Sequence, residues 1–386
     1  QEFQLRVSIW SLSENKRRII QSPKYSEKGI KFSPNGKYLA VVERKGYKDH
    51  IGIYLVETWE MIKQFQVSTT DLEDIQWAPD DSVIAVWDTN LEYTVFIYSP
   101  TGKQLGKYQA YEGYLGIKKV AWSTTGLFLS IGSFDQKLRL INNITWSKIC
   151  EFEHATPMTS SHVVVYNEMN EDWEDDGTKI EENLRGKKSS KKRYMRQKNK
   201  PAELKGPTKY VIQPPPANIP QIIPDPSSAN LPKMGVGIID WSCNDEFVIT
   251  RNDNMPHTLW VWNVKFLSLI SVIKHDSPIR CAVWDPTRSR LLLCTGKNKL
   301  YMWSQEGCSI INVPLKDFKV RSLKWNPHGG SLILMDKNKF CCCYINDPDE
   351  NVDPNSSAAN QKNATENSIN QSNYTDESMI SHDSRQ

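Results

Sequence analysis

The chain has 386 residues and a mass of 44.4 kDa, a length that suits one large β domain or about two or three small ones. Its 48 Lys and Arg residues nearly balance its 45 Asp and Glu residues, so bulk charge alone gives no argument for nucleic acid or a membrane as a partner. No apolar run has the roughly 18 residues of a membrane-spanning helix, and we expect no membrane contact. The eight cysteines form no CxxC pair, which indicates free thiols in a reducing compartment.

Residues 1–21 match the end of a β-sheet unit whose beginning is absent. The opening residues Gln1–Arg6 include no apolar signal-peptide core and no initiating Met. The run Leu5–Trp10 alternates like the third strand of the units described next. We therefore expect a partial blade over residues 1–21, in a chain that lacks upstream repeats.

A pattern of an apolar residue, a variable residue, Trp or Phe, a small residue and a turn recurs along the rest of the chain. Its aromatic residue stands at Phe32, Trp77, Trp122, Trp241, Trp284 and Trp325, in steps of 45, 45, 119, 43 and 41 residues. A period of about 40–45 residues is that of the blades of WD-repeat propellers. Each copy continues with a Pro- or Gly-bearing turn and further short β-rich runs, as a four-stranded up-and-down sheet requires.

The fold class that follows is an all-β, WD-repeat β-propeller with six recognisable blades and a partial N-terminal one. We expect three blades over residues 25–154 and three over 234–346. The repeated aromatic residue is expected to pack between neighbouring blades. The last unit has no clear fourth strand after Ile345, and the run Arg17–Ile20 could supply it and close a ring.

The step of 119 residues contains an insertion over residues 155–233. It holds an acidic block at Glu168–Glu182 with a net charge of −7, a basic block at Gly186–Lys200 with +8, and a stretch at Gln213–Pro232 with seven prolines. Like-charge blocks and Pro-rich runs bury too little apolar surface to fold, so we expect a long disordered loop. Residues 347–386, rich in Asn and Ser, are expected to form a disordered tail.

The basic run within this insertion leaves three interpretations open: a solvated loop that neutralises the acidic block, a contact with an acidic partner such as a tubulin tail, or a nuclear or RNA-directed signal. Tyr194 is the one aromatic residue beside it, so stacking platforms for nucleic acid are lacking. The residues of this run are Lys187, Lys188, Lys191, Lys192 and Arg193.

The sequence carries no catalytic or metal-binding constellation. The motifs G-x-S-x-G, P-loop, H-E-x-x-H and G-x-G-x-x-G are absent. Adjacent thiols at Cys341, Cys342 and Cys343 alternate across a strand, so we expect buried structural cysteines. His154 and His275 are expected to tie loops to neighbouring strands by hydrogen bonds. We predict a protein that is not an enzyme and that has no metal or cofactor.

Two polar and aromatic segments link a second to a third strand, where a propeller exposes one face. Charged and aromatic residues together there suit protein binding, although Asn/Asp-rich turn chemistry is the equally weighted alternative. The loop around Tyr111 and Glu112 is similar but occupies a fourth-strand position. The candidate residues of the two segments are Asp88, Glu92, Tyr93, Arg251, Asn252, Asp253 and Asn254.

Four segments also resemble a known family, that of the centrosomal WD-repeat protein eight, or WD-repeat protein antisense to the p-seventy-three gene. The segments are Val86–Tyr93, Tyr111–Lys118, Thr250–Pro256 and Leu300–Ser304. The resemblance implies a non-enzymatic scaffold in the cytoplasm and cytoskeleton, at the centrosome and spindle pole, with centriolar satellites or the ciliary base as further sites. It implies a coiled-coil partner, the SSX-interacting protein or its fungal anchoring counterpart, together with microtubule minus-end and pole components. Such a scaffold anchors minus ends and supports spindle organisation and cilium assembly.

The alternative function is a nuclear adaptor, in RNA processing or as a substrate receptor of a ubiquitin ligase, addressed by the basic run. Deletion of Lys187–Lys200 separates the two hypotheses, because the adaptor would lose its nuclear signal without a defect at the poles. Family members have further repeats upstream, and no unit here ends its third strand with a literal Trp-Asp pair.

Overall fold

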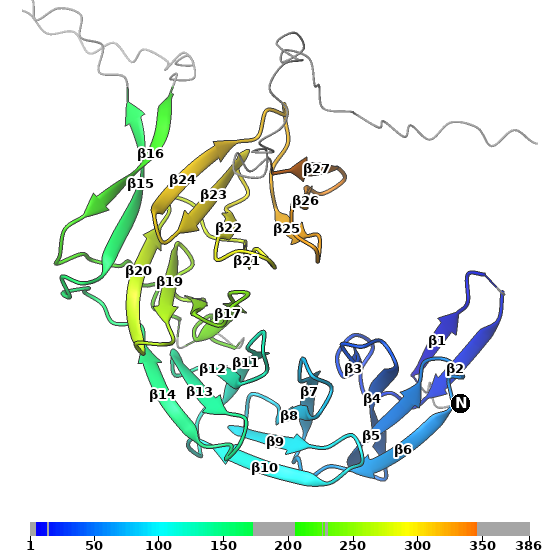
Figure 1. Cartoon of the computed structure of the whole chain (residues 1–386). Coiled ribbons are helices and arrows are strands. Elements are labelled where there is room, and N and C mark those ends of the chain that lie inside the picture. The colour runs from blue at the N-terminus through cyan, green and yellow to red at the C-terminus, as the bar shows by residue number, and fades with distance from the viewer. Residues whose placement is uncertain (1–4, 14, 173–204, 226, 228–230, 346–386) are drawn as a thin grey trace, which may run out of the picture. The chain divides into compact units, whose positions relative to one another are not determined.

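The computed structural model describes residues 5–13, 15–172, 205–225, 227 and 231–345, and all of its regular elements are β-strands. Five sheets follow the repeat, and Figure 1 labels most of their strands. Blade 1 comprises β3 (Ile30–Phe32), β4 (Tyr38–Lys45), β5 (Lys48–Leu55) and β6 (Met61–Gln66). Blade 2 comprises β7 (Leu72–Trp77), β8 (Ile84–Asp88), β9 (Thr94–Tyr98) and β10 (Gln104–Gln109). Blade 3 comprises β11 (Ile117–Trp122), β12 (Phe128–Ser133), β13 (Lys137–Asn142) and β14 (Lys148–Glu153).

After the insertion the same arrangement resumes. Blade 4 comprises β17 (Val236–Trp241), β18 (Phe247–Asn252), β19 (Thr258–Asn263) and β20 (Ser268–Lys274). Blade 5 comprises β21 (Cys281–Trp284), β22 (Leu291–Cys294), β23 (Lys299–Ser304) and β24 (Gly307–Asn312). Within blades 1–5 each strand pairs antiparallel with the next, which confirms the up-and-down units expected from the sequence.

Blade 6 has three strands among the described residues: β25 (Ser322–Trp325), β26 (Ser331–Met335) and β27 (Phe340–Tyr344). The sequence left open whether Arg17–Ile20 supplies its fourth strand, and the structure places that run in another sheet. This run forms β2 (Arg17–Gln21), which pairs with β1 (Arg6–Trp10) in a separate two-stranded sheet, because the short connection between them favours a local hairpin.

The small residue after the aromatic position explains the turn that follows it. The hydroxyls of Ser33, Ser123 and Ser242 accept the backbone N–H five residues later, at 2.9, 3.1 and 2.9 Å. These serines are buried, so the bonds satisfy groups that water cannot reach. The repeat therefore encodes a closed turn between the first and second strand of a blade.

The repeated Trp is an inter-blade residue, as predicted. The indole Nε1–H of Trp77 donates to the Lys31 carbonyl of blade 1 at 3.1 Å, and that of Trp284 donates to the Asp240 carbonyl of blade 4 at 3.3 Å. In both cases the acceptor precedes the aromatic residue of the preceding blade. Trp122 follows the same rule with Gln76, at 3.4 Å.

Blades 3 and 4, which the insertion separates in sequence, use a variant of this contact. The Trp241 indole donates to the Ser130 hydroxyl at 3.0 Å, and that hydroxyl donates to the Ala121 carbonyl at 2.6 Å. Phe128 stacks on Trp241 with ring centroids 5.9 Å apart. The insertion therefore leaves the contact between blades intact.

Phe32 is the exception to the predicted packing. Its side chain is 57% exposed, because β1 and β2 provide no first strand against which it could pack. It contacts the Trp59 ring edge-on at 6.5 Å instead.

The boundaries expected for the disordered insertion are wrong on both sides. Val164–Asp172 forms β15 and Lys205–Gln213 forms β16, an antiparallel hairpin. Strand β15 also pairs in parallel with β20, so the hairpin extends blade 4 to a six-stranded sheet, and Figure 1 shows it beside β20. Residues 173–204, with the basic run, and the tail at 346–386 lie outside the described residues.

Replacing Trp77 by Phe removes the indole donor but retains most of the buried ring. We expect a loss of about 1–3 kcal/mol in the free energy of unfolding, because the Lys31 carbonyl loses its partner. Trp325→Phe is the matched control: the Trp325 Nε1–H is buried without a hydrogen-bond partner, so its removal should cost little or stabilise the protein. Urea unfolding of both variants tests the contact, and equal losses would contradict it.

Candidate protein-binding face

The candidate segments lie at one end of the sheets. Because successive strands reverse direction, the turn between second and third strands and the link from a blade to the next leave the sheets at the same end. Residues 89–93 join β8 to β9, residues 110–116 join β10 to β11, and residues 253–257 join β18 to β19. We call this end of the sheets the candidate face. The loop of Tyr111 and Glu112 therefore shares a face with the two other segments.

Tyr93 and Tyr111 form a stack over a buried arginine. Their ring centroids are 4.7 Å apart, and the Arg139 guanidinium lies 5.2 Å from the Tyr93 ring and 5.6 Å from the Tyr111 ring. Tyr93 is 1% exposed, and the Tyr111 hydroxyl donates to the Leu115 carbonyl at 2.8 Å. The stack fixes the loops of blades 2 and 3 against each other.

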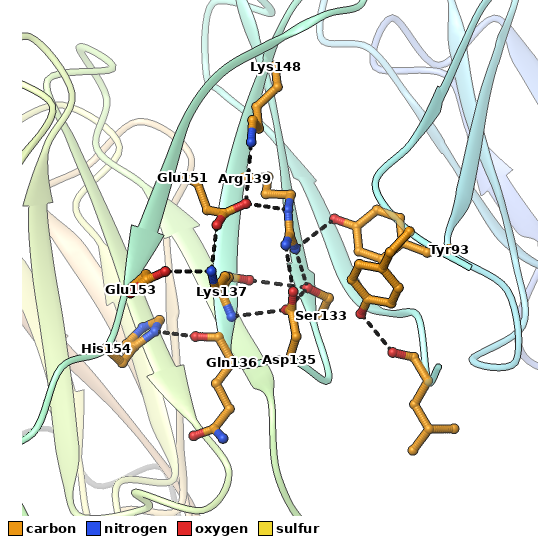
Figure 2. A network of polar contacts seen from close by, with 12 residues as sticks. Tyr93, Ser133, Asp135, Gln136, Lys137, Arg139, Lys148, Glu151, Glu153 and His154 are labelled. Atoms are coloured by element: carbon orange, nitrogen blue, oxygen red, sulfur yellow. Dashed lines mark hydrogen bonds and ion pairs between the residues drawn. The ribbon is translucent and has the colours of Figure 1, made fainter. Parts of the chain in front are cut away.

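Arg139 itself is surrounded by acceptors, as Figure 2 shows. Its Nη2 meets Asp135 Oδ2 at 2.6 Å, its Nε meets Glu151 Oε2 at 2.8 Å, and its Nη1 donates to the Ser133 hydroxyl at 2.9 Å. Burial alone would lower the pKa of Arg139, but the Asp135 carboxylate more than offsets this and raises it. Burial raises the pKa of Tyr111 to about 12, so its phenol stays protonated. The cluster is a fixed structural support rather than an acid–base pair.

Close backbone contact holds the two loops of this junction together. The Gly116 N–H donates to the Asn90 carbonyl at 2.8 Å, and the Phe134 N–H donates to the Gly116 carbonyl at 3.0 Å. A Cβ on Gly116 would lie 2.3 Å from the Glu92 carbonyl oxygen, so glycine is required there.

The junction of blades 3 and 4 is held by charges. A β-bulge in β11 displaces Lys118, whose Nζ lies 2.7 Å from Asp253 Oδ2. Arg251 Nη2 lies 2.7 Å from Asp253 Oδ1, and Arg251 Nη1 donates to the Ile279 carbonyl at the entry to blade 5. Burial alone would raise the pKa of Asp253, but the Lys118 and Arg251 cations outweigh this effect and hold that pKa below its ordinary value.

Several predicted site residues are buried. Asp88 accepts the Asp71 N–H at 2.9 Å, and burial raises its pKa. Asn254 donates to Gln136 Oε1 at 2.8 Å, and the side-chain amide of Asn252 has no hydrogen-bond partner. Glu92 is partly exposed and Glu112 is exposed. The face therefore divides into a buried polar layer and a small exposed set.

Sequence reasoning missed Glu168, which lies in the acidic block. Its side chain is fully buried and accepts from Tyr301 Oη at 2.8 Å, His275 Nδ1 at 3.1 Å and the Asp276 N–H at 3.2 Å. Burial alone would raise the pKa of Glu168, but the bonds from His275 and Tyr301 hold it at about 2. The hairpin is thus anchored to blade 5 by a buried carboxylate. No local signal distinguishes Glu168 from its acidic neighbours.

The two histidines tie loops to strands, as predicted. His154 Nδ1 donates to the Gln136 carbonyl at 2.6 Å, and its Nε2 accepts from the Thr250 hydroxyl at 2.7 Å. Burial lowers the pKa of His154 to about 4, so its ring is neutral. His275 bonds to Glu168 and to the Tyr210 hydroxyl, and burial lowers its pKa as well.

The prediction of buried cysteines in blade 6 is wrong. Cys342 is exposed, and Cys341 and Cys343 are partly buried with sulfur atoms 4.0 Å apart. The exposure follows from the position of β27 at the edge of its sheet. The short distance between the Cys341 and Cys343 sulfur atoms follows because residues two apart on a strand share a face. The described residues contain no group of three potential metal ligands. Within the same residues, no helix has the length and apolar character needed to cross a bilayer.

The architecture and its repeat define a WD-repeat β-propeller protein. No family model matches the chain. The chain is 39% identical over 345 residues to the mouse WD repeat-containing protein WRAP73, which covers 89% of this chain and 72% of that protein. The chain therefore belongs to the WRAP73 family of WD-repeat proteins.

Two further comparisons agree with this class. An uncharacterised WD repeat-containing protein of Schizosaccharomyces pombe is 23% identical over 300 residues, which covers 76% of this chain and 54% of the yeast protein. A chain from the crystal structure of the mitotic checkpoint complex superposes with a TM-score of 0.52 at 13% identity, covering 89% of this chain and 82% of that one. This structural likeness concerns the fold alone.

Replacing Glu168 by Gln should release the hairpin. The amide cannot accept all of the bonds that the carboxylate accepts, so we expect a loss of about 2–4 kcal/mol. Hydrogen exchange measured by mass spectrometry should rise in Val164–Asp172 and Lys205–Gln213 more than in blades 1 and 2. Glu153→Gln, at a side chain that is 64% exposed, is the control. Unchanged protection of the hairpin would contradict the anchoring role.

His154 should make stability depend on pH. Because its folded pKa of about 4 lies below the value of about 6.5 in an unfolded chain, the unfolded state binds the proton first. Its contribution is complete above pH 6.5 and falls as pH drops toward 4, by about 2 kcal/mol at pH 5. The difference in unfolding free energy between wild type and His154→Asn should shrink accordingly from pH 7.5 to 5. His162→Asn, at an exposed side chain, is the control variant.

Proposed function

We propose that this chain is a non-enzymatic scaffold of the centrosome and spindle pole that anchors microtubule minus ends by protein–protein binding. Membership in the WRAP73 family is the observation that carries the proposal. The resemblance of four segments to the centrosomal family supplies the cellular site, and WD-repeat propellers generally bind rather than catalyse. Spindle organisation and cilium assembly follow as the processes that such a scaffold would support.

The mechanism is joint binding without chemistry. A propeller presents loops from several blades on one rigid face, so two partners can be held at once and their local concentration raised. We propose a coiled-coil protein of the SSX-interacting or anchoring type as one partner and minus-end or pole components as the others. The loops at the junctions of blades 2, 3 and 4 support this use, because internal bonds fix them before any partner arrives.

Imaging of a tagged full chain through mitosis tests the proposal. We expect a focus at both poles, and affinity purification from mitotic cells should recover the coiled-coil partner. A diffuse signal throughout mitosis would count against the scaffold role.

A chain without residues 187–200 separates the scaffold from a nuclear adaptor. For the scaffold, the pole focus should survive the deletion. Loss of a nuclear signal with intact poles would favour the adaptor instead.

A further inference from the structure

The junction of blades 2 and 3 exposes two large side chains on tightly held loops. Tyr114 is 77% exposed in the link from β10 to β11, and Leu91 is 70% exposed in the turn from β8 to β9. The backbone bonds through Gly116 join these two loops. Exposed side chains on such loops can contact a partner with little further cost for ordering the backbone.

Tyr114 rests on the aromatic stack beneath it. Its ring meets the Tyr111 ring edge-on at 6.4 Å, and Tyr111 in turn contacts Tyr93 at 4.7 Å. The cation of this stack is Arg139, which is buried and already paired with Asp135 and Glu151. Tyr114 is therefore the exposed ring of a series of three tyrosine rings, and the two rings beneath it already contact the Arg139 guanidinium.

The carboxylates of the loops that carry Leu91 and Tyr114 differ from three others on the candidate face. Asp71 pairs with Lys24, Asp135 with Arg139, and Asp253 with Lys118. Among the described residues, by contrast, Glu92 and Glu112 have no cationic partner. Glu112 accepts one neutral bond, from the Gln109 side-chain amide at 2.8 Å. Two carboxylates without a cationic partner thus belong to the same pair of contacting loops as an exposed aromatic ring.

We propose that Leu91, Glu92, Glu112 and Tyr114, the Tyr114 patch, bind a basic segment of a partner protein. An arginine suits it best, because a guanidinium stacks on an aromatic ring and bonds carboxylates at the same time. Leu91 contacts an apolar side chain next to that arginine. The proposal rests on the scaffold function and adds the chemistry of one partner.

Tyr47 provides an internal comparison. It is 96% exposed in the turn from β4 to β5, on the same face, but its neighbours in sequence are Arg44, Lys45 and Lys48. Exposed tyrosine is therefore common to both places, but the carboxylates near Tyr47 are already paired with cations: Asp49 and Asp71 with Arg44, and Glu43 with Lys45. A basic segment should select Tyr114 over Tyr47.

Fluorescence anisotropy of the full chain with a labelled peptide of repeated Gly-Arg-Leu units tests the patch. We expect saturable binding that weakens with salt. The double variant Glu92→Lys with Glu112→Lys should weaken it roughly tenfold or more, and Tyr114→Ala several-fold. Tyr47→Ala should leave it unchanged. A Glu92→Gln, Glu112→Gln variant, which introduces no new charge, should show a smaller loss in the same direction.

Several outcomes would overturn the patch. These are binding that survives the Lys and Gln variants, a loss in Tyr47→Ala as large as in Tyr114→Ala, or no binding by the wild type up to about 1 mM peptide. Urea unfolding of each variant shows whether it is folded. A wild-type chain that binds the peptide but forms no pole focus would refute the proposed scaffold function and support binding by the Tyr114 patch. A pole focus without peptide binding would support the scaffold function and refute the patch.

Discussion

A four-stranded sheet with two apolar faces cannot be stable alone, and in blades 2–5 of this protein the indole at the end of the first strand joins that sheet to the preceding one. The ring buries apolar area between two blades, and its single N–H finds an acceptor on the preceding blade, as Trp77 does with Lys31. The Ser130 relay carries the same contact between blades 3 and 4. The register between blades follows from this bond, and so does the alignment of the loops that leave each sheet at one end.

The candidate face inherits its rigidity from that alignment. Buried groups beneath it are matched in charge, with Arg139 between Asp135 and Glu151 and with Lys118 against Asp253. An unpaired buried charge would be costly, and these ion pairs satisfy Arg139 and Lys118. The exposed layer above is built differently, because among the described residues Glu92 and Glu112 have no cationic partner and the Tyr114 ring is exposed. A layer of ion pairs beneath exposed charged and aromatic groups suits a protein-binding face.

Two strands of the insertion, β15 and β16, belong to the sheet of blade 4. Parallel pairing of β15 with β20 and burial of Glu168 join the hairpin to blades 4 and 5. Asp172 pairs with Lys205 in register, so the two strands of the hairpin stay paired up to the last described residue on each side.

The sequence alone determined the order of strands and turns within a blade. Each repeat carries the information locally, in the spacing of its Trp or Phe residue, the small residue of its turn and the alternation of its short strands. It also predicted the inter-blade role of the indole and two of the loops of the candidate face, but not that the loop of Tyr111 shares that face. It did not reveal that Tyr111 packs on Tyr93 or that the Arg139 guanidinium lies against both rings. Nor did it reveal that Glu168, one acidic residue among many in its segment, is buried. Those facts depend on which surfaces meet after folding, and a side chain's burial and charge partners come from segments far away in the chain. For the same reason only the tertiary structure decided that β2 pairs with β1, and that a hairpin of the insertion completes the edge of blade 4.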